Sequence, residues 1–286
     1  MDVLSPRSLD EALEQKAARP DAVPVAGGTD LWVAVNFGTA RPPAILDLSR
    51  VGELKTWSVD DGRVRLGAGV TFARIERELA AFRALAEAAR SVGSPQIRNR
   101  ATIGGNLATA SPAGDGIPVL AAYGADVVVA SSRSGTRSEP WNRFFTGPKR
   151  TTLAPDELIV AVEWDAVDAP GSFAKVGTRN AMVIAIAGLC LQLDPAGRSV
   201  RLALGSVAPT VVRAAGAETF AADAVAWDEP GRPLAEGAVE EFGRLAAAAA
   251  HPIDDVRGSA AYRRRAVEVL ARRALLWTLD DLGAAA

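Results

Sequence analysis

Two short stretches with paired glycines, Val25-Ala26-Gly27-Gly28-Thr29-Asp30 and Thr102-Ile103-Gly104-Gly105-Asn106, are the most informative part of this sequence. The first stretch continues a predicted strand, Ala22–Ala26. Glycine has no side chain and tolerates positive φ, so backbone N–H groups beside it can approach an anion such as a pyrophosphate. Paired glycines are also common in tight turns and bulges, and the residues alone leave both interpretations open.

The spacing of the glycines argues against the two best-known nucleotide motifs. A Rossmann turn needs G-x-G-x-x-G between a strand and a helix, and Gly67-Ala68-Gly69 is only a fragment of that pattern. The sequence contains no P-loop either.

Composition limits the chemistry further. The chain has 286 residues, enough for about two domains or one composite domain, and its net charge of -2 gives no sign of a nucleic-acid surface. The single cysteine, Cys190, can neither form an internal disulfide nor hold an iron–sulfur cluster. The single histidine, His251, precedes Pro252 and does not build a catalytic triad. We therefore predict no catalytic side chain and no metal site, and we expect a bound cofactor to carry the difficult step.

The N-terminal residues show no basic stretch followed by an apolar one, so no secretory signal is expected. The longest apolar run is far shorter than the ~20 residues that span a bilayer. We expect a cytoplasmic protein without a membrane span.

Local patterns predict an α+β fold. Ser8 and Glu11 form a capping box before a short helix, and Asp60-Asp61-Gly62 is typical of a hairpin turn. Apolar residues from Phe72 to Leu85 recur at helical spacing and predict one amphipathic helix. Two terminal helices are expected near 236–250 and 259–279. The predicted strands are Ala22–Ala26, Ala44–Leu48, Trp57–Val59, Val64–Leu66, Asp126–Ala130, Leu158–Trp164, Ser172–Val176, Met182–Leu193 and Val200–Val207.

The two glycine stretches, the second extended to Asp115, closely resemble the FAD-binding segments of the medium subunit of the xanthine dehydrogenase and carbon monoxide dehydrogenase family. Leu202–Thr210 and Asp255–Arg263 resemble signatures of that family's C-terminal domain. The resemblance covers nearly the whole chain and implies a vanillyl-alcohol-oxidase-type FAD fold in two subdomains, residues 1–55 and 56–170. An α+β C-terminal domain, residues 171–286, would follow.

The resemblance also implies which residues contact FAD. One segment would wrap the pyrophosphate: Pro24, Val25, Ala26, Gly27, Gly28, Thr29, Asp30 and Leu31. The opposite wall would be Thr102, Ile103, Gly104, Gly105 and Asn106. Asp115 would make a polar contact, Ile159 would pack near the nucleotide, and Lys175 would lie near the flavin. The alternatives are a helix cap for Asp115 and a solvated strand lysine for Lys175. Arg263, Arg264 and Arg265 are expected on a solvated helix face, with a docking surface as the alternative.

In the family, a molybdenum-containing large subunit acts on the substrate and a small [2Fe–2S] subunit passes electrons to FAD. The flavin then reduces NAD, O₂ or another acceptor. The resemblance therefore implies an electron-transfer oxidoreductase subunit with those two partners. The alternative is a stand-alone FAD-dependent oxidase or dehydrogenase that acts on a small molecule without molybdenum partners.

Overall fold

The computed structural model describes residues 1–285, which divide into two compact units. Unit 1 comprises residues 1–75, 94–110 and 124–166, and unit 2 comprises residues 76–93, 111–123 and 167–286. Each unit is therefore assembled from three separate stretches of chain. The predicted division into residues 1–55, 56–170 and 171–286 stays a prediction. Within the described residues, no helix combines the length and the apolar character that crossing a membrane requires.

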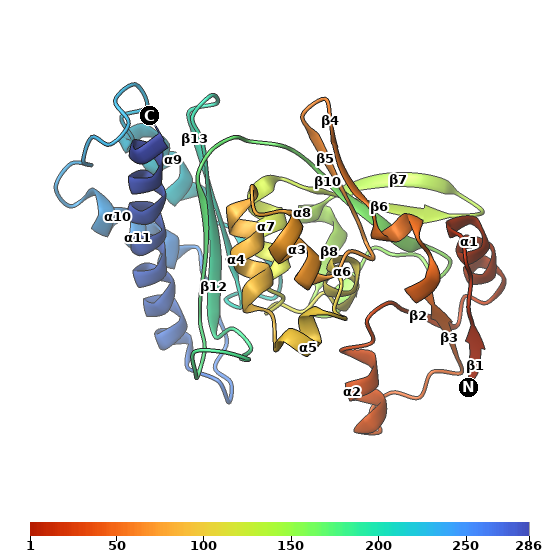
Figure 1. Ribbon diagram of the computed structural model, residues 1–286. Coiled ribbons are helices and arrows are strands. Elements are labelled where there is room, and N and C mark those ends of the chain that lie inside the picture. The colour runs from red at the N-terminus through yellow and green to blue at the C-terminus, as the bar shows by residue number, and fades with distance from the viewer. Residues whose placement is uncertain (286) are drawn as a thin grey trace. The chain divides into compact units, whose positions relative to one another are not determined.

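The first part of unit 1 is a small parallel sheet with the strand order β1-β3-β2. It contains β1 (Asp2–Leu4), β2 (Ala22–Val25) and β3 (Ala44–Asp47), with α1 (Leu9–Ala18) between the first two strands. Ser8 caps α1 by accepting the Glu11 N–H at 3.2 Å, as the capping-box pattern predicts. The connection from β2 to β3 carries α2 (Leu31–Asn36), which stands apart from the sheet in Figure 1. Two 3₁₀ turns, Leu48–Arg50 and Glu53–Lys55, follow β3.

The second part of unit 1 is an antiparallel sheet with the order β4-β5-β10-β6-β7. Its first hairpin joins β4 (Trp57–Asp60) and β5 (Arg63–Gly67) through Asp61 and Gly62, both with positive φ, as the turn sequence predicts. The other strands are β6 (Asp126–Ser131), β7 (Gly135–Pro140) and β10 (Leu158–Asp165). The remaining elements are α5 (Pro95–Arg98), α6 (Ile103–Thr109), α8 (Trp141–Phe144), β8 (Phe145–Gly147) and β9 (Arg150–Thr151).

Unit 2 is a three-layer arrangement around the antiparallel sheet β11-β12-β13-β14 (Figure 1). The sheet consists of β11 (Gly171–Val176), β12 (Ala187–Asp194), β13 (Ser199–Gly205) and β14 (Val212–Arg213). One side packs against α4 (Arg83–Ser91) and α7 (Gly116–Tyr123). The other side packs against α9 (Ala215–Ala224) and α11 (Ala260–Ala285), and α10 (Ala238–Ala248) packs against α11. Because helices cover both faces, β12 is buried along nearly its whole length, which explains its continuous apolar sequence.

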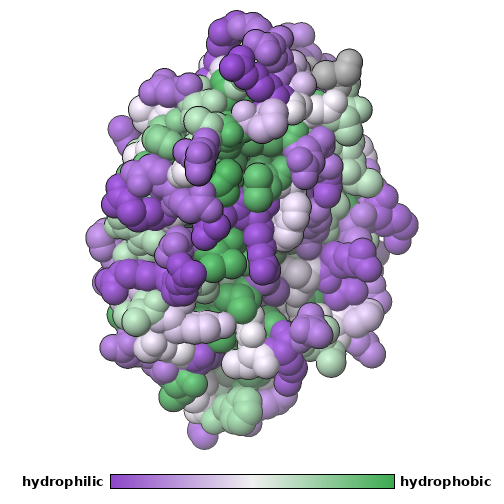
Figure 2. All heavy atoms as spheres, turned by 90° about the vertical axis from the view of Figure 1, so that its left-hand side faces the viewer, coloured by the Kyte–Doolittle hydropathy of each residue, from purple (hydrophilic) through white to green (hydrophobic). Residues whose placement is uncertain are grey.

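Figure 2 views the molecule from the side of α10 and α11, where hydrophobic residues form a band among hydrophilic ones. On α11, Tyr262, Leu276 and Trp277 are exposed, whereas Val267, Ala271 and Leu275 are buried against the sheet. The last helix thus has a core-facing apolar stripe and further apolar side chains on its outer surface.

Several local predictions were wrong. The expected single helix from Phe72 to Leu85 is two helices, α3 (Phe72–Glu78) and α4, because the chain leaves helical geometry at 79–82. The strand expected from Met182 begins only at Ala187. The elements β7, α8, β8, β9 and α9 were not predicted at all.

Candidate cofactor site

Unit 1 brings the two glycine stretches together. Pro24 and Val25 end strand β2, Ala26–Asp30 form a loop, and Leu31 begins α2. A side chain on Gly27 would place its Cβ 2.0 Å from the carbonyl oxygen of Arg100, just before the second stretch. This close approach is open only to glycine, so Gly27 seats the loop against the chain that leads into α6.

The loop from Gly27 to Leu31 has unused hydrogen-bond donors. Within residues 1–285, none of its N–H groups donates a hydrogen bond to the protein. Gly28 has a φ of +73°, and a Cβ there would lie 2.4 Å from Cδ1 of Trp32. The residues Gly27–Thr29 are half-buried and Asp30 is exposed. A run of free N–H groups on a half-buried glycine loop is an arrangement that suits an anionic oxygen ligand.

The second stretch is built differently, because its donors are already used. The Ile103 N–H donates to Val70 at 3.1 Å, the Gly104 N–H to Ala68 at 2.9 Å, and the Asn106 N–H to Thr102 at 3.0 Å. The Gly105 N–H donates to the Thr102 hydroxyl at 3.0 Å, which caps α6. This segment can therefore offer a surface and side-chain atoms to a ligand, but not the N–H groups of its first turn.

The two glycines of the second stretch differ in their surroundings. A Cβ on Gly104 would lie 2.6 Å from the Cβ and 2.7 Å from the carbonyl oxygen of Ala68, so Gly104 lets α6 pack closely on the chain after β5. A Cβ on Gly105 would meet only the Thr102 hydroxyl, at 3.2 Å. The neighbouring Asn106 has a buried Oδ1 with no hydrogen-bond partner in the described chain. An open glycine beside an orphaned buried acceptor fits a ligand that bears hydrogen-bond donors.

Further contacts in unit 1 frame this region. The Thr109 hydroxyl lies 3.4 Å from Oδ2 of Asp30 and links the end of α6 to the glycine loop. Ile159 is 7% exposed in β10, a strand that packs against α6. Arg100 and Ala68, the two residues that seat the glycines, were not singled out from the sequence. Their only sequence signal is that each lies within a few residues of a glycine.

Unit 2 contains the other two predicted contacts, and they bind each other. The Lys175 ammonium lies 2.6 Å from Oδ2 of Asp115, and the side chains are 11% and 10% exposed. Lys175 also donates to the carbonyl oxygens of Ser91 at 2.9 Å and Val183 at 3.3 Å. Burial raises the pKa of Asp115, and the Lys175 ammonium opposes that rise. The alternative of a solvated Lys175 was therefore wrong, and the Asp115 carboxylate contacts Lys175 and Ser91 rather than capping α7.

Arg263 was expected on a solvated face and is instead 4% exposed. Its guanidinium donates to the carbonyl oxygens of Ile186 at 2.6 Å and Ser206 at 2.8 Å, and it forms an ion pair with Asp255 at 2.6 Å. It therefore ties the start of α11 to the ends of β12 and β13. Arg264 and Arg265 are exposed, as predicted.

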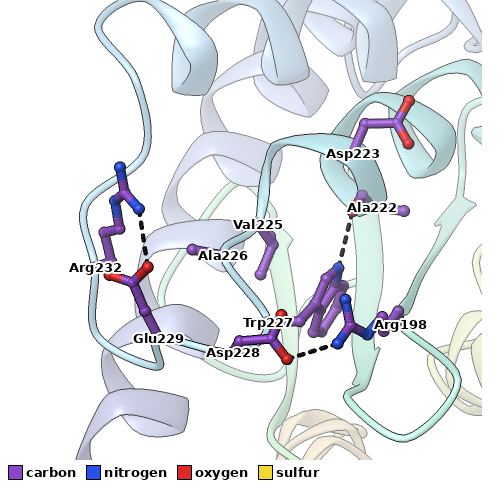
Figure 3. Close-up of a pocket in the computed structure, with 9 residues that line it drawn as sticks. All are labelled: Arg198, Ala222, Asp223, Val225, Ala226, Trp227, Asp228, Glu229 and Arg232. Atoms are coloured by element: carbon purple, nitrogen blue, oxygen red, sulfur yellow. Dashed lines mark hydrogen bonds and ion pairs between the residues drawn. The ribbon is translucent and has the colours of Figure 1, made fainter.

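Unit 2 also has a surface pocket, and none of the residues that line it was predicted to contact the cofactor. Figure 3 shows Arg198 paired with Asp228 at 2.6 Å, and the Trp227 indole N–H donating to Ala222 at 2.8 Å. Its charges are largely paired with each other, which gives an anionic cofactor no free cationic partner. The lining residues are Arg198, Ala222, Asp223, Val225, Ala226, Trp227, Asp228, Glu229 and Arg232. In residues 1–285, no group of three or more His, Cys, Asp or Glu side chains is arranged to hold a metal ion.

Comparison with known proteins identifies the two parts of the chain. Residues 1–164 match the family described as "FAD binding domain in molybdopterin dehydrogenase", and residues 172–278 match "CO dehydrogenase flavoprotein C-terminal domain". The nicotinate dehydrogenase FAD-subunit of Eubacterium barkeri is 37% identical over 68% of this chain and 70% of its own length. The nicotine 6-hydroxylase medium subunit of Paenarthrobacter nicotinovorans is 32% identical over 95% of both chains.

A solved structure agrees over the full length. A chain of quinoline 2-oxidoreductase from Pseudomonas putida 86 superposes with a TM-score of 0.89 at 27% identity, covering 99% of this chain and 98% of that one. The predicted α+β fold, with an FAD-binding part followed by a C-terminal domain, is confirmed. The chain belongs to the family of FAD-binding oxidoreductase subunits of the xanthine dehydrogenase and carbon monoxide dehydrogenase type, with FAD as its cofactor.

Proposed function

We propose that this chain is the flavin-carrying electron-transfer subunit of a cytoplasmic molybdenum hydroxylase, receiving electrons from a [2Fe–2S] subunit and delivering them to NAD, O₂ or another acceptor. The single observation that carries the site assignment is the run of unused N–H groups from Gly27 to Leu31 on a glycine loop. FAD, when bound, supplies the redox chemistry that this chain's own side chains lack.

The residues would divide the work of binding. The N–H groups of Gly27–Leu31 would donate to the pyrophosphate, while Pro24, Val25 and Ala26 fix the direction in which the loop leaves β2. The first turn of α6, held by Thr102 and Ile103, would form the facing surface, with Gly105 leaving room and Asn106 offering its orphaned Oδ1 to a donor of the cofactor. Ile159 would supply apolar contact behind α6.

Asp115 and Lys175 would act through charge. Lys175 carries a positive charge in a largely buried position, and such a charge favours electron density on a nearby group. Asp115 partly neutralises that charge and fixes the position of the ammonium at 2.6 Å. The pair would therefore orient the lysine and moderate its influence on the flavin.

The relatives support a partner-dependent role. Their names refer to different substrates, including nicotinate and nicotine, yet the FAD-carrying chain is shared. This pattern is expected if the substrate is handled by another subunit. By analogy, the partners of this chain would be a molybdenum-containing large subunit and a [2Fe–2S] small subunit.

Two measurements test the proposal. The chain purified from its native host should show flavin absorption and contain iron and molybdenum in constant ratio to FAD. A yellow protein without iron or molybdenum that still oxidises a small molecule would establish the stand-alone alternative instead.

Hydrogen exchange tests the site assignment separately. Amides of Gly27–Leu31 should exchange quickly without FAD and become protected when FAD is added. Amides of Ile103–Asn106 should be protected in both states, because they are already bonded within the protein. Unchanged exchange in the glycine loop on FAD binding would refute its assignment.

A further inference from the structure

Arg100 lies in the short connection between α5 and α6, where hydrogen bonds fix the main chain (Figure 1). Its own N–H and that of Ala101 both donate to the carbonyl oxygen of Ile97, at 3.0 and 2.7 Å. The carbonyl oxygen of Ala101 accepts the Phe72 N–H at 3.0 Å. The backbone position of Arg100 is therefore set by the fold of unit 1.

That backbone position is directly beside the glycine loop. A Cβ on Gly27 would lie 2.0 Å from the carbonyl oxygen of Arg100 and 2.5 Å from its carbonyl carbon. The main chain of Arg100 thus packs on the first residue of the loop whose N–H groups are unused from Gly27 to Leu31. An arginine side chain that starts from this point is long enough to reach a ligand held by the loop.

The Arg100 side chain has no partner in the protein. It is exposed, and within residues 1–285 its guanidinium forms no hydrogen bond or ion pair. Arg98, the other cation of this connection, is half-buried and already interacts with another part of the chain. A guanidinium is always charged and presents a planar fork of donors that matches the geometry of a phosphate group. Arg100 is therefore the cation of this connection that is available to an anionic ligand.

The residues predicted to contact FAD leave the charge of its pyrophosphate unbalanced. The charged members of that set are Asp30, Asp115 and Lys175, and the ammonium of Lys175 is paired with Asp115 at 2.6 Å. Asp30, in the glycine loop itself, adds a further negative charge. The loop N–H groups supply hydrogen bonds but no full positive charge. A cation beside the loop would offset both Asp30 and the pyrophosphate.

We propose that Arg100 binds the pyrophosphate of FAD together with the glycine loop and supplies the positive charge that the predicted contacts lack; this inference rests on the proposed function. The loop N–H groups position the phosphate oxygens, and the guanidinium adds charge-assisted hydrogen bonds to them. Because the side chain is exposed, dissolved salt weakens its contribution.

The test compares Arg100→Gln and Arg100→Lys with the control Arg41→Gln. Arg41 is also exposed and without a partner in residues 1–285, but it precedes β3, whereas the glycine loop follows the parallel neighbour β2 at the opposite ends of these strands. The full chain, freed of FAD, is titrated with FAD at low and at high salt, and binding is followed by flavin fluorescence. Urea denaturation without FAD checks the fold of each variant, and its midpoint should not change.

The expected effect depends on charge and on salt. Arg100→Gln should raise the Kd for FAD roughly 10-fold at low salt, and the ratio to wild type should shrink at high salt. Arg100→Lys keeps the charge but loses the fork of donors, so its Kd should stay within about 3-fold of wild type. Arg41→Gln should match wild type at both salt concentrations.

Each other outcome overturns the inference in a distinguishable way. Wild-type affinity in Arg100→Gln refutes the contact while leaving the proposed function intact. A loss that is the same at both salt concentrations, and equal in Arg100→Lys, shows a structural role instead. Arg50 is a further exposed arginine without a partner in residues 1–285, and it follows β3. A salt-dependent loss in Arg50→Gln, with none in Arg100→Gln, assigns the charge to Arg50. Failure of the wild-type chain to bind FAD refutes the proposed function itself.

Discussion

Gly105→Val separates a ligand-facing glycine from a glycine that the fold requires. The Cβ added at Gly105 meets only the Thr102 hydroxyl at 3.2 Å, and valine has a higher helix propensity than glycine. The stability of the protein without FAD should therefore change by less than about 1 kcal/mol. If FAD packs against this surface, the extra methyl groups impose an overpacking cost of about 1–3 kcal/mol, which weakens FAD binding roughly 5- to 150-fold.

Two comparison variants sharpen the experiment. Gly104→Val places its Cβ 2.6 Å from Ala68 and should lower the stability of the protein itself. Gly216→Val in α9 lies in open space and should change neither property. FAD affinity is measured by flavin fluorescence, and stability without FAD by urea denaturation. Wild-type FAD affinity in Gly105→Val would show that the cofactor does not contact this wall, and a stability loss equal to that of Gly104→Val would contradict the open geometry.

Three further substitutions test the buried charges. Lys175→Met leaves Asp115 buried without its partner and should destabilise the protein by about 3–5 kcal/mol in urea, with part of the loss restored by adding Asp115→Asn; an unchanged midpoint would contradict the buried pair. Arg263→Ala should cost a similar amount, about 3–5 kcal/mol, whereas the exposed neighbour Arg264→Ala should stay within about 0.5 kcal/mol, and equal losses would refute the burial difference. The Arg137 guanidinium holds the pKa of Glu157 below its usual value, so its stabilising contribution is present above the ordinary glutamate pKa and is lost as pH falls through the lowered one. Glu157→Gln should therefore flatten the acid limb of the stability curve, and an unchanged acid limb would show that the ion pair does not contribute.

Local features of the fold could be predicted where they depend only on residues that are close together in the sequence. The hairpin at Asp61-Gly62 needs positive φ at both residues, and the capping of α1 needs only Ser8 and its near neighbours. Helix α9 was missed because Ala215–Ala224 contains small residues and little apolar periodicity, so its packing on β13 decides its structure. The break after Glu78 was missed because the apolar spacing continues through it.

The sequence named candidate site residues but did not predict the contacts that those residues make within the protein. The family resemblance indicated both Asp115 and Lys175, yet their pairing joins residues 60 positions apart. The burial of Arg263 likewise depends on carbonyl groups of Ile186 and Ser206, distant in sequence. A run of arginines looks the same in sequence whether its first member points into the core or into water. Such contacts are set by tertiary structure, which a single sequence does not display.

The two glycine pairs are doubled for a physical reason. In each pair one glycine is required by the protein's own packing: Gly27 against the carbonyl group of Arg100, and Gly104 against Ala68. The second glycine meets side-chain atoms instead of backbone: a Cβ on Gly28, whose φ is +73°, would lie 2.4 Å from Cδ1 of Trp32, and a Cβ on Gly105 would lie 3.2 Å from the Thr102 hydroxyl. The first glycine lets the backbone of its segment pack closely on another segment of unit 1. In the proposed site, the second would leave room for the cofactor, with free N–H groups only in the loop of Gly28. Under the proposed function, each glycine pair would therefore combine a packing contact within unit 1 with a position next to the cofactor.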